Sequence, residues 1–209
     1  MTDYYWGTPD ASVSFCEPKY TMVPWVAEYH NTITSLIYAV VGIIFLGTNV
    51  DRMAKCLIVV GIGAACLHMT LRKYGQWLDE LSMLYLIYCG LRHLRPDRFK
   101  MYMLIPLTAG YYVFCDNFLF FLATFTGMQV VIFVEARRQL PAKYGPWATS
   151  YIVTFSTATV CWLLDQTLCS YVVAYQLHAW WHVLTGIAIG QGFVGLALTA
   201  AAKESDKSE

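Results

Sequence analysis

Charged residues are scarce in this chain of 209 residues, of which Asp, Glu, Lys and Arg together make up 13%. An ordinary soluble domain has roughly 25%. Hydrophobic residues make up 57% of the chain, and 14 basic residues balance 14 acidic ones. No basic tract alternates with aromatic residues in the way that nucleic-acid-binding surfaces do. The composition argues against nucleic acid as a partner and predicts a membrane protein.

Other signals are missing as well. The N-terminal stretch MTDYYWGTPDASVSFCEPKY has neither the basic nor the apolar part of a cleavable signal peptide, so we expect the first spanning helix to target the protein. Without internal repeats or a long linker, we expect a single domain over 1–209, with an extracytoplasmic N-terminal segment at 1–29 and a polar tail at 203–209. The absence of lysine between Lys143 and Lys203 excludes a retinal Schiff base in the last helix.

What the chain does have is a series of long apolar runs. A bilayer core of roughly 30 Å takes about 20 helical residues to cross. Seven runs of about this length occur, at approximately 30–49, 55–72, 78–94, 100–116, 117–135, 147–166 and 178–202. The break near Asp116 and Asn117 separates the fourth run from the fifth, and without it the count would be six. We therefore predict an all-α protein with seven transmembrane helices.

The basic residues indicate the orientation of these helices, because short cytoplasmic loops carry the excess of Lys and Arg. With seven spans, one side of the membrane holds Arg52, Lys55, Arg92, Arg95, Arg98, Lys100, Arg137, Arg138, Lys143, Lys203 and Lys207. The other side holds Lys19, Arg72 and Lys73. This asymmetry predicts a lumenal or extracytoplasmic N-terminus and a cytoplasmic C-terminus.

Three histidines are expected at one depth in this topology. His178 and His182 of HAWWHVLTG lie in the first turns of the last helix, near the lumenal face. The second helix ends on the same side, with His68 of AACLHMTL about one turn from its end. Across a short loop, Asp79 of QWLDEL is expected to open the third helix, while Glu80 is expected to face another direction.

The spacing of these histidines indicates metal binding. Residues four apart share one helical face, so His178 and His182 can bind a single ion, with His68 as a third ligand. Three imidazoles with an open fourth position are typical of catalytic zinc. A lone buried histidine is more often a packing residue, but ionisable groups inside a membrane tend to mark function. A haem site fits less well, since its axial histidines usually come from different helices. We assign no role to His30 or His93.

The neighbouring Trp180 and Trp181 are expected to be interface anchors that indicate depth.

The motifs HMTL, LDEL and HAWWHVLTG, in this order and spacing, closely resemble those of the alkaline ceramidases, seven-helix zinc amidases of the wider group that includes the adiponectin receptors. YYWG, FCE and AEYHNT at the N-terminus are also similar, so the resemblance runs from about residue 4 to 200. It implies hydrolysis of a membrane lipid, a ceramide-like N-acyl sphingoid base, to a fatty acid and a sphingoid base. Carried over to this chain, it assigns zinc to His68, His178 and His182, and a water-positioning role to Asp79.

One departure from the family pattern affects the proposed chemistry. The family has a serine four residues before the second-helix histidine, and this chain has Ala64. Loss of one oxyanion donor typically costs about 10² to 10³ in rate. The chain is then a weakened hydrolase, or another group replaces the hydroxyl. The alternative is a zinc-containing lipid-binding receptor or scaffold without turnover.

A second departure concerns calcium, which several family members bind through their N-terminal segment. Glu17 and Glu28 are kept, but Ser14 stands at an expected aspartate and Lys19 at an expected asparagine. Calcium prefers six to eight oxygen ligands, so the substitutions predict poor binding. We expect the Lys19 ammonium to take the place of the ion and to neutralise Glu17 and Glu28. The alternative is that Lys19 points into water.

Two of the seven cysteines lie on the oxidising side in this topology. Cys16 belongs to the N-terminal segment and Cys169 to the loop before the last helix, so a disulfide between them is compatible with the topology, although spacing alone does not establish pairing. The other five are interpreted as packing residues. The expected location is the endoplasmic reticulum or Golgi in a eukaryote, or the plasma (inner) membrane in a bacterium. The sequence identifies no protein partner.

Overall fold

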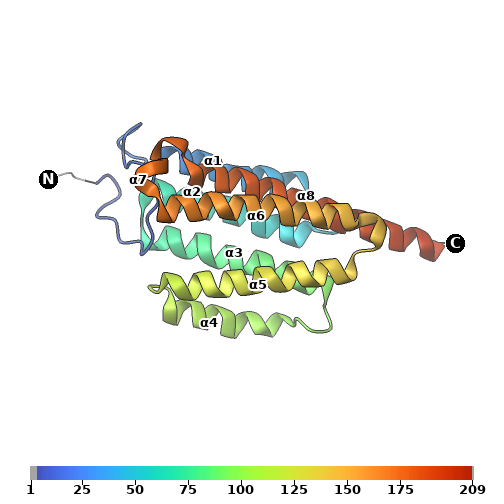
Figure 1. The fold of residues 1–209 in the computed structure, drawn as a ribbon. Coiled ribbons are helices and arrows are strands. Elements are labelled where there is room, and N and C mark those ends of the chain that lie inside the picture. The colour runs from blue at the N-terminus through green and yellow to red at the C-terminus, as the bar shows by residue number, and fades with distance from the viewer. Residues whose placement is uncertain (1–3, 209) are drawn as a thin grey trace.

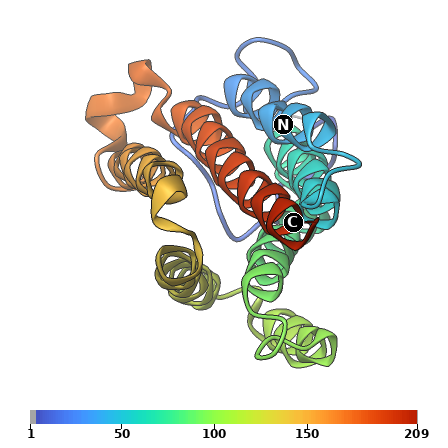
Figure 2. The same ribbon diagram turned by 90° about the vertical axis from the view of Figure 1, so that its right-hand side faces the viewer.

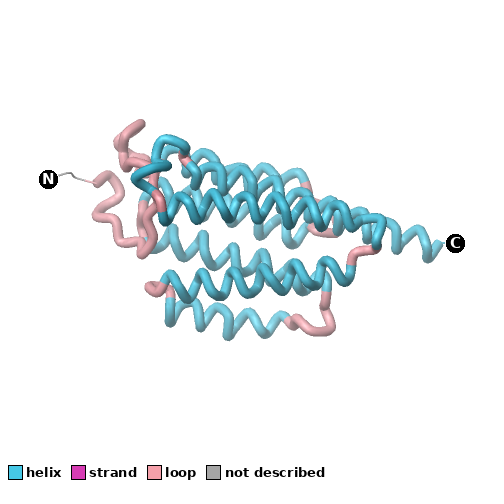
Figure 3. Tube along the Cα trace, viewed as in Figure 1, coloured by secondary structure: helices cyan, strands magenta, loops and turns pink. Residues whose placement is uncertain are grey.

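The computed structural model describes residues 4–208, with side chains up to residue 199, and every regular element in this range is a helix (Figures 1 and 3). The α-helices are α1 (Tyr29–Ile44), α2 (Asp51–Thr70), α3 (Lys73–Leu94), α4 (Leu104–Phe114), α5 (Phe118–Gln139), α6 (Gly145–Thr167), α7 (Cys169–Val172) and α8 (Leu177–Ser208). Short 3₁₀ helices are η1 (Met101–Met103), η2 (Ala142–Tyr144) and η3 (Val173–Tyr175).

Four helical segments are long and apolar enough to cross a membrane: Asp51–Thr70, Phe118–Gln139, Ala142–Thr167 and Leu177–Thr199. Tyr29–Ile44 and Met101–Phe114 are apolar but shorter. In the most apolar 18-residue stretch of the α5 and α6 segments, only 22% and 17% of the residues are buried inside the protein, so most of these residues lie outside the core. The prediction of an all-α membrane protein is confirmed.

Several helix boundaries differ from the predicted ones. α1 ends at Ile44, before a turn in which Gly47 has a φ of 75°. α3 begins at Lys73, so Asp79 lies in the second turn and does not open the helix as predicted. The break near Asp116 is confirmed, because the Asn117 side chain accepts hydrogen bonds from the first backbone N–H groups of α5.

The helix α8 is longer than the predicted span and continues to Ser208. The expected polar tail 203–209 therefore extends this helix up to residue 208, and Glu209 lies outside the described residues.

The long helices form a ring in which α1, α2, α3, α5, α6 and α8 are neighbours in this order, and α8 closes the ring against α1. Seen along the helices, α4 lies outside the ring beside α3 and α5 (Figure 2). The pairs α1–α2, α2–α3 and α6–α8 pack closely, whereas α5 and α6 touch only locally. Buried apolar side chains such as Leu57, Leu84 and Phe155 fill the space between the helices.

The N-terminal segment is bound to the end of the ring where α2 ends and α8 begins (Figure 1). The backbone N–H groups of Ala27 and Glu28 donate to carbonyls of the last turn of α2. A disulfide joins Cys16 to Cys169 in α7, across a sequence separation of 153 residues. The segment therefore lies directly over the predicted histidine site.

Candidate metal and substrate site

The three predicted histidines lie together. His68 is in the last turn of α2, and His178 and His182 are in the first turns of α8. Their rings are 1%, 4% and 2% exposed, and one ligand nitrogen from each lies within 4.8 Å of the others. The sequence prediction that these imidazoles share one depth is confirmed, and the group can hold a metal ion.

Hydrogen bonds orient two of the rings. Nδ1 of His68 lies 2.6 Å from a Glu28 carboxylate oxygen, and Nδ1 of His182 lies 3.0 Å from the Thr34 hydroxyl. Nε2 of each ring therefore remains for a metal. Nδ1 of His178 is buried and has no hydrogen-bond partner within the described part of the chain. An orphaned buried imidazole nitrogen beside two oriented ones fits zinc, which prefers neutral imidazole ligands.

Glu28 links this histidine group to the N-terminal segment. Its side chain is fully buried and contacts the Lys19 ammonium, which also donates to the carbonyls of Phe15 and, at 2.9 Å, of Glu17. Burial alone would raise the pKa of Glu28, but its hydrogen bonds with His68 and Lys19 and the positive charge of Lys19 lower it. The carboxylate is thus held ionised between an ammonium and an imidazole.

The expectation for Lys19 is met at Glu28 but not at the Glu17 carboxylate. That carboxylate accepts the backbone N–H groups of His30 and Asn31, at 2.7 and 2.9 Å, in the first turn of α1. Since such N–H groups have no partner within the helix and carry the positive end of its dipole, an acidic group there is stabilising. Ser14 is exposed and is not a partner of Lys19.

Asp165 of α6 fixes the other side of the site. It is 3% exposed and accepts the Cys16 backbone N–H at 3.1 Å. It also accepts from the backbone of His178. One carboxylate thus joins α6, the disulfide region and the first turn of α8. Asp165 was not among the sequence predictions, because the N-terminal segment and the start of α8 come close to it only in the folded protein.

A cavity of about 280 Å³ adjoins the histidines, and Ala64, Asp79 and Glu80 line it together with His178 and His182. α2 and α3 approach so closely here that a side chain at Gly63 would lie 2.7 Å from the Asp79 backbone nitrogen. This glycine allows α3 to pack closely against α2 at Asp79, which lines the same cavity as His178 and His182. Glu80 lies in the same cavity, so the expectation that it faces elsewhere is wrong.

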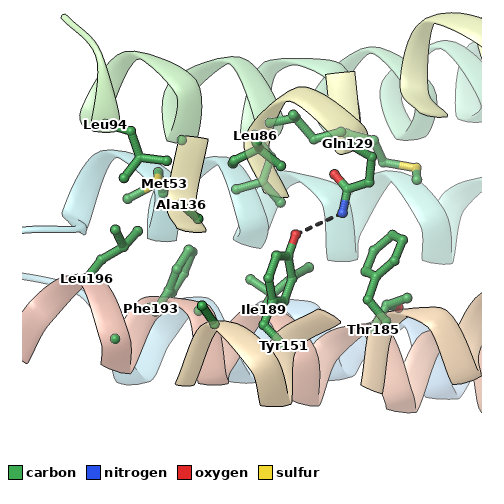
Figure 4. A pocket seen from close by; sticks show the side chains of 18 of the residues that line it. Met53, Leu86, Leu94, Gln129, Ala136, Tyr151, Thr185, Ile189, Phe193 and Leu196 are labelled. Carbon is green, nitrogen blue, oxygen red and sulfur yellow. Dashed lines mark hydrogen bonds between the residues drawn. The ribbon is translucent and has the colours of Figure 1, made fainter. Parts of the chain in front are cut away.

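A second cavity, of about 100 Å³, lies further along the bundle and is almost entirely apolar (Figure 4). Residues that line both cavities include Tyr38, Met83, Phe125, Gln129 and Trp181. Gln129 donates a hydrogen bond of 2.8 Å to the Tyr151 hydroxyl, as the dashed line in Figure 4 shows. Trp181, predicted as an interface anchor, is only 8% exposed and is part of this lining, whereas Trp180 is 53% exposed.

Comparison with known proteins identifies the family. The family model described as Ceramidase matches residues 7–209. The chain belongs to the ceramidase family. It is 27% identical to mouse alkaline ceramidase 3, over 88% of this chain and 81% of that protein.

Two further relatives agree. The chain is 25% identical to Saccharomyces cerevisiae alkaline ceramidase YPC1, over 88% of this chain and 75% of that protein. It is 23% identical to the Arabidopsis thaliana alkaline ceramidase, over 86% and 80% respectively. The resemblance seen in the sequence motifs is confirmed, and the chain is an enzyme of the amidohydrolase class.

Proposed function

We propose that this protein is a zinc-dependent intramembrane hydrolase that cleaves the amide bond of ceramide-like N-acyl sphingoid bases. The observation that supports the proposal most strongly is the buried group of His68, His178 and His182 at a cavity that Asp79 also lines. Zinc at such a site supplies Lewis acidity and activates water at neutral pH. The substrate class comes from the family membership.

In this proposal Asp79 carries the proton. The attacking water forms a bond to the amide carbon, and its proton passes to the Asp79 carboxylate. As the carbon–nitrogen bond breaks, Asp79 returns the proton to the leaving nitrogen, which gives a fatty acid and an amine. Glu28, Thr34 and Asp165 keep the histidines in position through the hydrogen bonds described above.

Two adjacent cavities that share lining residues suit a lipid with two chains. The metal-side cavity also has lining residues on α5 and α6, including Val130, which is 54% exposed. Because α5 and α6 touch only locally, we propose that the lipid reaches the site sideways from the bilayer, between these helices. A soluble amide has no such path within the membrane.

We further propose that α1 to α6 and α8 all cross the membrane as one domain, with the N-terminus lumenal or extracytoplasmic. The support is the distribution of Lys and Arg and the disulfide, which requires an oxidising compartment. In a eukaryote this topology fits the endoplasmic reticulum or Golgi, and in a bacterium the plasma membrane.

A lipid-binding receptor that holds zinc without turnover is the second candidate, and Ala64 favours it. Ala64 lines the cavity and is 2% exposed. Its methyl side chain provides no hydroxyl at this position. The two candidates predict the same metal and differ in fatty acid release.

The test measures zinc content and fatty acid release from a ceramide on purified protein. We expect one zinc per chain, lost in the His178→Ala, His182→Ala double variant and kept in His30→Ala, which removes an exposed histidine outside the site. Fatty acid release that disappears with the metal supports the hydrolase. Zinc without release supports the receptor, and full zinc in the double variant would contradict both.

A further inference from the structure

Glu80 is a buried carboxylate that the proposed hydrolysis does not use. It lies in α3, is 3% exposed and lines the metal-side cavity next to Asp79. No ion pair among the side chains that the structure describes includes it. An acidic group without a cation is costly inside an apolar bundle and tends to mark function there.

Two neutral donors hold this carboxylate in place. Gln76 donates to one oxygen at 2.9 Å, and the fully buried Tyr111 hydroxyl donates to the other at 2.8 Å. Gln76 is itself fixed by two hydrogen bonds of 2.7 Å with Ser12 of the N-terminal segment. A carboxylate has about four acceptor positions. Two positions on Glu80 therefore remain after the protein partners are counted.

Glu135, another buried carboxylate, shows the contrasting arrangement. Glu135 is equally buried, but Arg95 and Arg98 lie 3.3 and 3.5 Å from its oxygens. Its charge is balanced within the protein, as is common for buried acidic groups. Glu80 instead faces a cavity that contains the proposed reaction site, so a ligand with hydrogen-bond donors is the remaining partner.

We infer that Glu80 is a specificity residue that accepts hydrogen bonds from the hydroxyl groups of the sphingoid base. The inference rests on the proposed function, whose substrate class carries hydroxyl groups close to the scissile amide. Asp79 and Glu80 are adjacent on α3 and line one cavity, so the proton carrier and the hydroxyl acceptor would bind neighbouring atoms of one lipid. Simple N-acyl alkylamines, which lack the hydroxyls, would leave Glu80 without a ligand.

The test compares two substrates with the same acyl chain, an N-acyl sphingosine and an N-acyl octadecylamine that lacks both hydroxyls. We expect Glu80→Gln to reduce the ratio of their kcat/KM values by roughly 10- to 100-fold, the loss expected for a hydrogen bond to a charged group. Zinc content should not change. Tyr111→Phe should shift the ratio in the same direction, and it decides the matter if Glu80→Gln does not fold. The matched control Glu135→Gln should leave the ratio unchanged.

A binding measurement separates this inference from the proposed function. Free sphingosine should raise the Tm of the unmodified protein more than octadecylamine does, and Glu80→Gln should abolish the difference. If Glu80→Gln leaves the ratio of the two kcat/KM values unchanged, including by an equal loss of activity on both substrates, Glu80 only supports the fold. If the unmodified protein hydrolyses neither substrate, the proposed function fails, and the Tm comparison alone decides whether Glu80 binds hydroxyl groups.

Discussion

The Glu28 carboxylate lies 2.6 Å from Nδ1 of His68, and this contact connects a loop residue to a ring of the candidate metal site across 40 positions of sequence. Contacts of this kind fix the ring orientation and raise the basicity of the ligand nitrogen. Since Lys19 forms an ion pair with the same carboxylate, the N-terminal segment contributes side chains to the candidate site.

Asp79→Asn should abolish most of the hydrolysis while the metal stays bound. An amide cannot accept the proton of the attacking water, and general acid–base catalysis typically contributes about 10² to 10⁴ in rate. We expect a loss of that size in ceramide turnover, with zinc content and Tm close to those of the unmodified protein. Asp51→Asn, at the other end of α2, is the matched control. Full turnover in Asp79→Asn would remove this residue from the mechanism.

Ala64→Ser should raise ceramide hydrolysis at least tenfold, because it adds a hydroxyl donor to the cavity wall beside the histidines, where oxyanion donors contribute about 10² to 10³ in rate. Initial rates on samples with equal zinc measure the effect. Ala65→Ser places the same hydroxyl on the next residue of α2, which is not among those lining the cavity. Equal rates in the unmodified protein and Ala64→Ser would show that position 64 has no part in the chemistry.

Lys19→Met should destabilise the protein, because it leaves the fully buried Glu28 without its ammonium partner. Losing one member of a partly buried ion pair should lower the Tm by roughly 3–8 °C. The exposed Lys55 provides the control Lys55→Met. Differential scanning fluorimetry in detergent measures both variants, and an unchanged Tm in Lys19→Met would mean that the pair contributes nothing.

Calcium should have no effect on the unmodified protein, because the Lys19 ammonium already occupies the position between the Phe15 and Glu17 carbonyls and the Glu28 carboxylate. We expect the same Tm and activity with about millimolar calcium, a typical range for extracellular sites, as with chelator. In the Ser14→Asp, Lys19→Asn double variant, calcium should raise the Tm. A clear rise in the Tm of the unmodified protein with calcium would refute the proposal that the Lys19 ammonium takes the place of the ion.

Replacing Cys16 and Cys169 with serine should lower stability, since the disulfide closes a long loop. Loss of such a bond costs roughly 2–5 kcal/mol. We expect a lower Tm. Because the disulfide helps to hold the Cys16 backbone N–H against Asp165, we also expect weaker zinc retention during dialysis against a chelator. Cys66→Ser, at a half-buried free thiol, is the control. Unchanged stability after reduction would contradict the prediction.

The histidine site could be predicted from sequence because its parts are local. The spacing of His178 and His182 follows from the helical period, and the position of His68 follows from where an apolar run ends. The break at Asn117 was visible for the same reason, since a capping residue acts on its own helix. These features depend on a few neighbouring residues and on the thickness of a membrane.

The partners of the site could not be predicted, because they depend on how helices rotate and pack. Glu80 was expected to face another direction than Asp79, and Trp181 was expected to be an interface anchor, but both line the cavity. Asp165 gave no signal in sequence, since its partners come from the N-terminal loop and α8. The Lys19 ammonium was expected to neutralise Glu17, but the Glu17 carboxylate caps α1 instead.

The long sequence separations across the site constrain how the protein is made. Thr34 and His182 are 148 residues apart, and the two cysteines of the disulfide are 153 residues apart. While the ribosome is still producing α3 to α6, His68 and Glu28 exist without the two histidines of α8. The candidate metal site can therefore be completed only after the last helix has been made, because two of its three histidines belong to α8.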